Sequence, residues 1–176
     1  MPLLSTPPEL IKIANAIAKS EGRSILVGGA VRDHCMGRKS LKDFDVEIFG
    51  ISPEVLESVL RNFGNIHAVG KSFGVLKLKT SSAEYDFSLP RRENRTGKGH
   101  RGFMVTPDST MSYREAASRR DFTVNSIGYD LLTKTLLDPF DGLGDIKHKI
   151  LRHVGPAFAE DPLRVLRAMQ FSARLE

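Results

Sequence analysis

GGAVRDHCMGRKSLKDFDVE, residues 28–47, is the stretch that decides the fold of this 176-residue chain. A Gly-Gly pair follows a short apolar run at 24–27, and Asp43 and Asp45 lie two positions apart in a second apolar segment. Side chains alternate along a strand, so positions two apart share a face. We therefore expect Asp43, Asp45 and Glu47 on one face of a strand, with the apolar residues between them on the other.

Carboxylates placed side by side repel one another, so this pattern indicates binding rather than stability. Mg²⁺ prefers hard oxygen ligands and often keeps substrate phosphates as further ligands. The backbone at Gly28 and Gly29 can approach such phosphates closely. The pattern favours an enzyme that transfers a nucleotide, with two Mg²⁺ ions held by Asp43 and Asp45. An exposed strand face is the structural alternative, and the preceding glycine turn argues against it.

Composition is that of an ordinary globular chain, with 40% hydrophobic and 27% charged residues. No apolar run approaches the ~20 residues that span a bilayer, and the N-terminus lacks the pattern of a secretory signal. The single Cys35 cannot form an internal disulfide, which fits a cytoplasmic protein and a buried apolar role for this residue. The net charge is +5, and basic residues concentrate at 90–102, which predicts a flexible loop that either binds nucleic acid or is simply solvated.

Helices and strands alternate along the chain. Thr6 and Glu9 predict a capping box for a first helix that ends near Gly22, and Ser112 with Glu115 predicts a second capping box. Strands are expected at 24–27, 43–49, 66–69, 73–79, 84–89 and within 127–138, and further helices at 30–36, from 52 and from 161. This order predicts an α+β fold with a mixed or antiparallel sheet, the aspartates on one face and helices on the other.

Two further acids extend the aspartate pattern. Asp86 lies between apolar residues on a later strand and is a candidate third carboxylate, which would activate the attacking hydroxyl or complete the metal site. A plain surface acid is its alternative. Glu47 shares the expected face of Asp45, and we interpret it as peripheral to the site.

Five ordered motifs carry a family resemblance. They are GGAVRD at 28–33, DFD at 43–45, RRDFTVN at 119–125, the segment from Asp138 to Arg152, and EDPLR at 160–164 followed by Arg167. Together they resemble the head domain of the polymerase β superfamily, and more narrowly the class II tRNA nucleotidyltransferase (CCA-adding enzyme) and bacterial poly(A) polymerase family. The resemblance implies a nucleotidyltransferase head at 1–150 and the start of an all-helical neck at 151–176. We expect the chain to be an N-terminal catalytic fragment.

The resemblance also implies an activity, template-independent addition of CMP and AMP from CTP and ATP to the 3′ end of tRNA, with release of pyrophosphate. Asp43, Asp45 and Asp86 would be the catalytic carboxylates. The nucleotide-binding residues would be Gly28, Gly29 and Arg32 at the triphosphate, Asp121 and Asn125 at the ribose, Arg120 as a phosphate contact, and Glu160, Asp161, Arg164 and Arg167 on the last helix. Asp33 is expected to be structural.

Base recognition has a physical basis in the last of these motifs. Asp161 and Arg164 are three residues apart and share a helix face. The carboxylate can accept from the exocyclic amine of cytosine or adenine while the guanidinium donates to the adjacent ring acceptor, which rejects uracil and guanine. Glu160 would hold Arg164 in place. A simple helix start with a favourable acid is the structural alternative.

Several alternatives stay open. The enzyme could be a poly(A) polymerase of the same fold, or a specialist that adds only CC or only A. A nucleotide-binding regulatory module without turnover is a different class, and the intact Asp-x-Asp pattern argues against it. This chain alone could also bind nucleotide without extending tRNA, because the family grips tRNA mainly through regions that this chain lacks. The sequence departs from the family's usual pattern at 86–91, which leaves the role of 90–111, a specificity-switching loop in the family, undefined.

Overall fold

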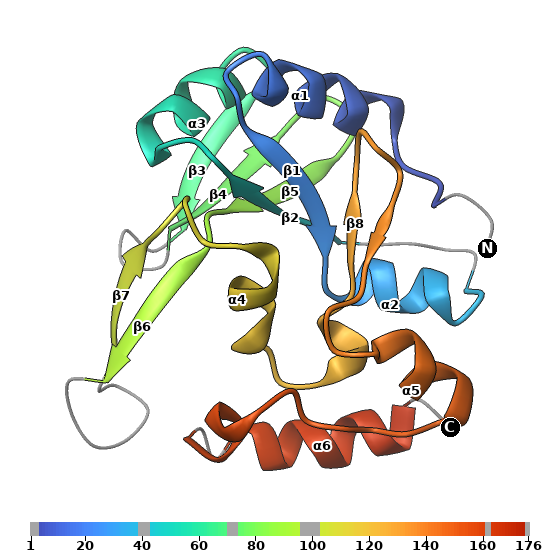
Figure 1. Ribbon diagram of the computed structural model, residues 1–176. Helices are drawn as coiled ribbons and strands as arrows, with labels where there is room; N and C mark the ends of the chain where they lie inside the picture. Colours follow the sequence, from blue (N-terminus) through green and yellow to red (C-terminus); the bar gives the residue numbers. More distant parts are fainter. Residues whose placement is uncertain (1–3, 39–42, 70–73, 96–102, 161–162, 175–176) are drawn as a thin grey trace.

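A seven-stranded mixed sheet forms the centre of the molecule, seen in a computed structural model that describes residues 4–38, 43–69, 74–95, 103–160 and 163–174 (Figure 1). In the order in which they pair, the strands are Asn65–Val69 (β3), Val75–Lys79 (β4), Glu84–Ser88 (β5), Phe44–Phe49 (β2), Arg23–Val27 (β1), Gly128–Asp130 (β8) and Leu136–Leu137 (β9). Strands β2 and β5 run parallel, and the other neighbours run antiparallel. The predicted α+β fold with a mixed sheet is confirmed.

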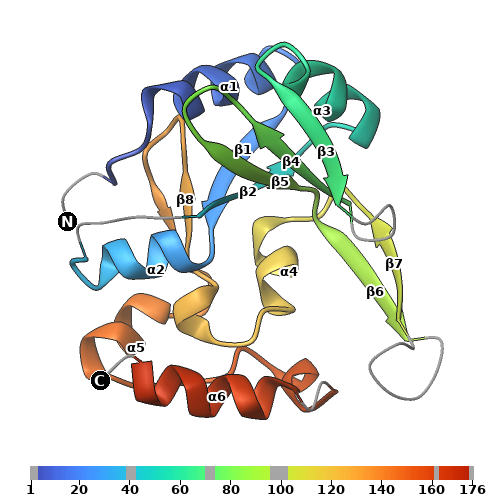
Figure 2. The same cartoon turned by 180° about the vertical axis from the view of Figure 1, so that it is seen from behind.

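Six α-helices accompany this sheet in the described residues. They are Pro8–Ala18 (α1), Gly29–Cys35 (α2), Pro53–Leu60 (α3), Tyr113–Ser118 (α4), Gly142–His148 (α5) and Leu163–Arg174 (α6), with 3-10 turns at Thr123–Asn125 (η1) and Pro156–Glu160 (η2). Helices α1 and α3 lie on one side of the sheet, and α4 and α6 lie on the other (Figures 1 and 2). No described helix is long and apolar enough to cross a membrane.

The main core lies between the sheet and the pair α1 and α3. Helix α1 contributes Leu10, Ile13 and Ile17, which are fully buried, and α3 contributes Leu56 and Leu60. They pack on alternate residues of the central strands, which are Leu26, Val46, Ile48, Leu78 and Phe87. Burial of each such side chain contributes ~1.5–3 kcal/mol, so this face holds the sheet together and frees the other face for polar groups.

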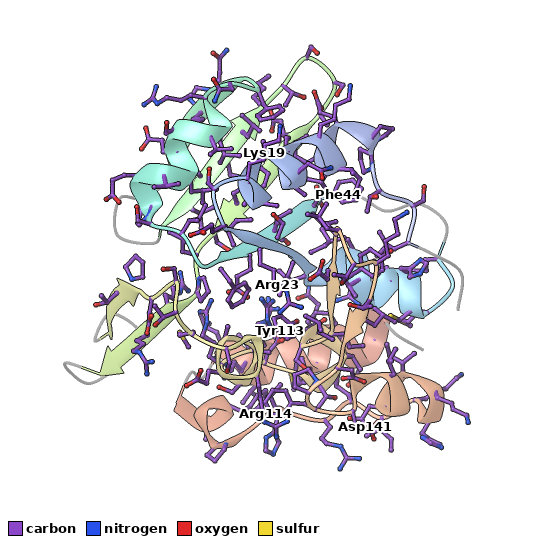
Figure 3. All side chains as sticks on the ribbon, turned by 45° about the horizontal axis from the view of Figure 1, so that its top comes forward. Lys19, Arg23, Phe44, Tyr113, Arg114 and Asp141 are labelled. Atoms are coloured by element: carbon purple, nitrogen blue, oxygen red, sulfur yellow. The ribbon has the colours of Figure 1, made fainter. Side chains whose placement is uncertain are left out.

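A smaller apolar cluster lies on the opposite face. Ile25, Val27 and Phe49 pack there against Ala116 of α4, with Tyr113 beside them. Figure 3 shows Phe44 and Tyr113 on opposite sides of the sheet, in agreement with their places in the two clusters. The remainder of this second face carries the candidate site.

The helix starts test the capping predictions. At α4 the predicted box is confirmed, because the Ser112 backbone N–H donates to the Glu115 carboxylate over 2.8 Å and the Ser112 hydroxyl accepts from the Glu115 N–H over 3.2 Å. The box predicted at Thr6 is wrong, because α1 begins after Pro7 without a side-chain cap. The Glu9 carboxylate instead accepts hydrogen bonds from Thr80, Ser82 and Tyr85, and so ties α1 to the β4–β5 turn.

The basic segment after β5 is not a simple loop. Residues Arg91–Arg95 (β6) and Phe103–Pro107 (β7) pair as an antiparallel ribbon that projects from the body of the molecule (Figure 1). The prediction of a flexible loop is therefore wrong for 91–95, where the charged residues form a strand paired with β7. Residues 96–102 lie outside the described residues.

Candidate active site

Two carboxylates meet at the parallel pair of strands. Asp45 on β2 is the register partner of Asp86 on β5, so both project from the face opposite α1 and α3. Asp86 in turn is the register partner of Lys77 on β4, whose Nζ lies 2.9 and 2.8 Å from the two carboxylate oxygens. The predicted third carboxylate thus lies beside Asp45, and it carries a lysine partner that the sequence analysis did not identify.

Repulsion among the carboxylates of this cluster affects the pKa of Asp45. Loss of solvation raises the pKa of Asp45, and the negative charge of Asp86 adds to this effect, as does that of Asp43. The positive charges of Arg120 and Lys77 oppose it. A bound cation would relieve the repulsion among the carboxylates, so the donor set fits a divalent ion.

Asp43 departs from the predicted alternation. It precedes β2 and has a left-handed backbone with φ of 57°, so it does not share the strand geometry of Asp45. Its negative charge nevertheless contributes to the raised pKa of Asp45. Among the described residues, no three His, Cys, Asp or Glu side chains are arranged to hold a metal ion by themselves. Mg²⁺ usually keeps several waters and is bound through one or two carboxylates together with substrate phosphates, which this donor set allows.

The glycine turn lies directly against this cluster. Gly28 has φ of 73°, and a Cβ at this position would lie 3.4 Å from an Asp45 carboxylate oxygen. The turn leads into α2, where Gly29 is the first helical residue. The predicted contiguity of the glycine pair and Asp45 is therefore present in the structure.

Arg32, on α2, is buried and engaged within the protein. Its Nη1 donates to the Asn125 side-chain oxygen over 2.8 Å, and its Nε and Nη2 donate to one oxygen of Asp33 over 3.0 and 2.8 Å. The guanidinium also lies over the ring of Phe171 on α6, 5.1 Å from its centroid. Asp33 has the structural role expected of it, whereas phosphate binding by Arg32 stays a prediction.

The RRDFTVN segment supplies a second buried network. One oxygen of Asp121 accepts from the Asn125 amide over 2.9 Å, and the other accepts from Arg167 Nε over 2.8 Å. Asn125 therefore links Asp121 to Arg32, and α2, η1 and α6 share one set of hydrogen bonds. The sequence placed these residues in one site, and the structure brings the four of them together.

Glu47 is the residue whose surroundings differ most from expectation. It is only 1% exposed, and its carboxylate pairs with Arg119 over 3.4 Å and with Arg120 over 3.1 Å. Its interpretation as peripheral stays a prediction, but the residue is buried on the site face and its carboxylate contacts Arg120, the predicted phosphate contact. Its two arginine partners follow 72 and 73 residues later in the chain, so no local signal could reveal them.

The structure describes only part of the EDPLR motif at 160–164. Arg164 Nη2 donates to the Arg119 carbonyl over 2.8 Å, and its buried Nη1 has no hydrogen-bond partner among the described residues. Asp161 and the side chain of Glu160 lie outside the described residues. The predicted pairing of Asp161 with Arg164 for base recognition stays a prediction.

A mixed sheet with carboxylates on one face, beside a glycine turn and across from a helical core, defines a nucleotidyltransferase head. The family model described as the poly(A) polymerase head domain matches residues 24–152. The chain belongs to this family.

Named relatives agree with this assignment. The multifunctional CCA protein of Xylella fastidiosa (strain 9a5c) is 46% identical over 153 residues, which cover 87% of this chain and 35% of the relative. That of Stenotrophomonas maltophilia (strain K279a) is also 46% identical, over 85% of this chain and 35% of its own length. The chain thus spans about a third of the length of the curated relatives it matches.

Solved structures resemble the fold over nearly the whole chain. The Bacillus stearothermophilus CCA-adding enzyme in complex with CTP superimposes with a TM-score of 0.77 and 31% identity, over 95% of this chain and 39% of that one. A tRNA nucleotidyltransferase complexed with a primer tRNA and an incoming ATP analog gives a TM-score of 0.73 and 32% identity, over 93% of this chain and 45% of that one.

Proposed function

We propose that this chain is the catalytic head of a CCA tRNA nucleotidyltransferase, which adds CMP and AMP to the 3′ end of tRNA. The observation that carries the proposal is the carboxylate pair of Asp45 and Asp86, set beside the Gly28 turn in a region 46% identical to a multifunctional CCA protein. The names of the relatives support the substrate class, and the site geometry supports the chemistry.

In this proposal the primer's 3′ oxygen attacks the α-phosphorus of CTP or ATP, and the bond to the β-phosphate oxygen breaks with release of pyrophosphate. Asp43 and Asp45 would hold two Mg²⁺ ions. When bound, such ions lower the pKa of the attacking hydroxyl and neutralise charge on the leaving group. Asp86 would accept the hydroxyl proton or complete the metal ligands, and Lys77 would fix the orientation of its carboxylate.

The remaining residues would bind the nucleotide. The backbone of Gly28 and Gly29 would receive the triphosphate with Arg32 and Arg120, and Asp121 and Asn125 would contact the ribose. Asp161 and Arg164 would read the base, with Glu160 and Arg167 in support. The Arg164 Nη1, buried without a partner in the described part of the chain, favours such a role because a ligand would satisfy it.

We further propose that residues 151–176 begin a helical neck and that tRNA is gripped mainly by regions beyond this chain. A cytoplasmic location is proposed with them. It is consistent with the lone Cys35, whose thiol pKa is raised to about 11 by burial and, to a smaller extent, by the charge of Asp138.

The test is an extension assay with Mg²⁺, a tRNA that lacks its CCA end, and labelled CTP and ATP, followed by sequencing of the 3′ ends. Ordered addition of C, C and A would establish the proposal, and Asp43→Asn should abolish it while the circular dichroism spectrum is unchanged. If the chain extends no tRNA, calorimetric titration with CTP separates a head that needs its missing regions from a protein without this function.

A second candidate is a poly(A) polymerase, favoured by the description of the matching family model. It predicts ATP as the only substrate and runs of A of no fixed length. The same sequenced products distinguish it, and addition of C alone or of a single A would indicate a specialist enzyme.

A further inference from the structure

Glu47 poses a physical problem that the proposed reaction does not by itself explain. A carboxylate that is 1% exposed has lost its hydration, and this is costly unless charged partners replace the water. Each of its oxygens has one such partner, Arg119 for Oε1 and Arg120 for Oε2. Buried ion pairs are often no more stabilising than apolar side chains of similar volume. Stability alone is therefore a weak reason for a carboxylate here.

The position of Glu47 in the sheet suggests another reason. It lies two residues after Asp45 on β2, and its register partners are Ile25 on β1 and Ser88 on β5. It therefore projects from the same face as Asp45 and Asp86. A side chain fixed at this position is held by the same strand that carries the candidate metal ligand Asp45.

Arg120 is the group through which Glu47 can act. One Nη of this arginine is held by Glu47, and its Nε is buried without a hydrogen-bond partner among the described residues. A guanidinium has five N–H donors, so the anchor leaves others available for an anion. Its positive charge acts on Asp45, so the arginine lies near the candidate metal ligand.

Arg119 extends the same anchor to the last helix. Its guanidinium pairs with Glu47, and its backbone carbonyl accepts from Arg164 Nη2 over 2.8 Å. Strand β2 carries the predicted metal ligand Asp45, and helix α6 carries the predicted base-reading arginine. The two elements are thereby connected through Glu47 and the dipeptide Arg119–Arg120.

We propose that Glu47 is a positioning residue, which holds the guanidinium of Arg120 beside the carboxylate cluster so that it binds the triphosphate of the incoming nucleotide. The inference rests on the nucleotidyl transfer proposed above. It assigns to Glu47 no contact with substrate, and its whole effect passes through Arg120.

The experiment is calorimetric titration of the 176-residue chain with CTP in the presence of Mg²⁺. The variants are Glu47→Gln, Arg120→Gln and their double mutant. Glu47→Gln keeps the volume and one acceptor oxygen but removes the charge. We expect it to weaken CTP binding roughly tenfold, the scale of one charge-assisted hydrogen bond. The double mutant should bind CTP no more weakly than Arg120→Gln alone, because the two residues act as one unit.

A matched control is Asp130→Asn. Asp130 is a buried carboxylate of the same sheet, on β8 beside Ile25. It pairs over 2.7 Å with Arg23, the residue at the end of β1 farthest from the glycine turn. This variant should lose about as much unfolding free energy in urea denaturation as Glu47→Gln does, while its CTP affinity stays that of the wild type. A second variant, Arg120→Lys, guards against misfolding of Glu47→Gln. The lysine ammonium lacks the planar, forked set of donors with which a guanidinium can bind Glu47 and a phosphate at the same time. CTP binding by Arg120→Lys should therefore weaken as well.

The direction of the effect makes the test decisive. Removal of a negative charge near the site would by itself strengthen binding of a polyanion, so weaker binding by Glu47→Gln requires lost positioning. The inference is overturned if Glu47→Gln binds CTP as tightly as the wild type or more tightly, if the effects of the two substitutions add, or if Arg120→Lys binds like the wild type. A wild-type chain that binds no CTP would instead refute the proposed function, and the inference would fall with it.

Discussion

Asp121→Asn tests whether the last helix is held to the head by a single carboxylate. In the structure this carboxylate is buried, receives three hydrogen bonds and makes one further ion-pair contact. The hydrogen bonds come from the Phe122 N–H over 2.8 Å, the Asn125 amide over 2.9 Å and Arg167 Nε over 2.8 Å, and Arg167 Nη2 lies 2.7 Å from the same oxygen as Nε. An amide at position 121 keeps the shape but loses the charge, and its NH₂ must face a donor of either Asn125 or Arg167.

The expected loss of unfolding free energy follows from these contacts. A hydrogen bond to a charged group contributes ~1.5–3 kcal/mol, and Arg167 makes one such bond and an ion-pair contact to the same oxygen of Asp121. The Arg167 side chain is 50% exposed, so solvent screening lowers the contribution of the pair. We expect Asp121→Asn to cost about 2 kcal/mol, and Arg167→Gln about 1 kcal/mol because its loss leaves Asp121 bound to Phe122 and Asn125.

The assay is native-state amide hydrogen exchange of α6, with urea denaturation for the whole chain. Both variants should accelerate exchange in α6, where Phe171 packs on Phe122, more than exchange in β1 or β2. In a double-mutant cycle the two sites should couple by about 1 kcal/mol. Unchanged exchange in α6, or a coupling energy within the error of about 0.3 kcal/mol, would refute the reasoning and leave apolar packing and the hydrogen bond from Arg164 to the Arg119 carbonyl as the anchors of the helix.

Three further predictions concern the sheet. Asp45→Asn should lower nucleotidyl transfer at least roughly 100-fold and leave the urea midpoint unchanged or raised, because it removes a proposed metal ligand and relieves repulsion among the carboxylates. Retained turnover would contradict the metal assignment. Lys77→Met should lower the Mg²⁺ concentration needed for half-maximal CTP binding, because the ammonium no longer competes with the metal ion for Asp86. The pair is exposed to solvent, so its loss should cost at most about 1 kcal/mol of stability. An unchanged Mg²⁺ requirement would count against this prediction. Burial raises the pKa of Asp130, but the hydrogen bonds from the Thr133 backbone and Arg23 outweigh it, and the net shift is downward. The stability that this group supplies is therefore present above its unfolded pKa and is lost as the pH falls through the folded value. The difference in unfolding free energy between wild type and Asp130→Asn should shrink below a pH of about 4, and a difference constant with pH would disprove the linkage.

The sequence predicts well what depends on local pattern. Alternation around Asp45 gives the correct face of β2, because a strand's period of two is set by the backbone itself. The Ser112 cap is equally local, since its partner Glu115 is three residues away. Asp43 escapes the same pattern because a positive φ ends the strand geometry one residue before Phe44, and nothing in the side-chain pattern indicates that.

Contacts across the sheet could not be predicted in this way. Asp86 lies beside Asp45, and Lys77 beside Asp86, only because the strands pair in one particular register. A shift of one residue would turn every side chain to the other face, and the sequence does not state the register of strands that are distant in the chain. The burial of Glu47 is the same kind of case, since a charged residue in a strand normally indicates solvent.

The charges of the site face explain why its parts occur together. Four carboxylates lie in or beside this face together with three cationic side chains: Asp43, Asp45, Glu47, Asp86, Lys77, Arg119 and Arg120. The carboxylates alone would repel a triphosphate, yet Asp43, Asp45 and Asp86 are the proposed hard ligands for a divalent ion. The cationic side chains neutralise most of that charge, so that binding of one divalent ion changes the net charge of the face from negative to positive. A nucleotide triphosphate would then be attracted chiefly when the metal is present. Metal-dependent CTP binding is thus expected from the charge arrangement alone, and equal CTP affinity with and without Mg²⁺ would show that the arginines bind the phosphates unaided.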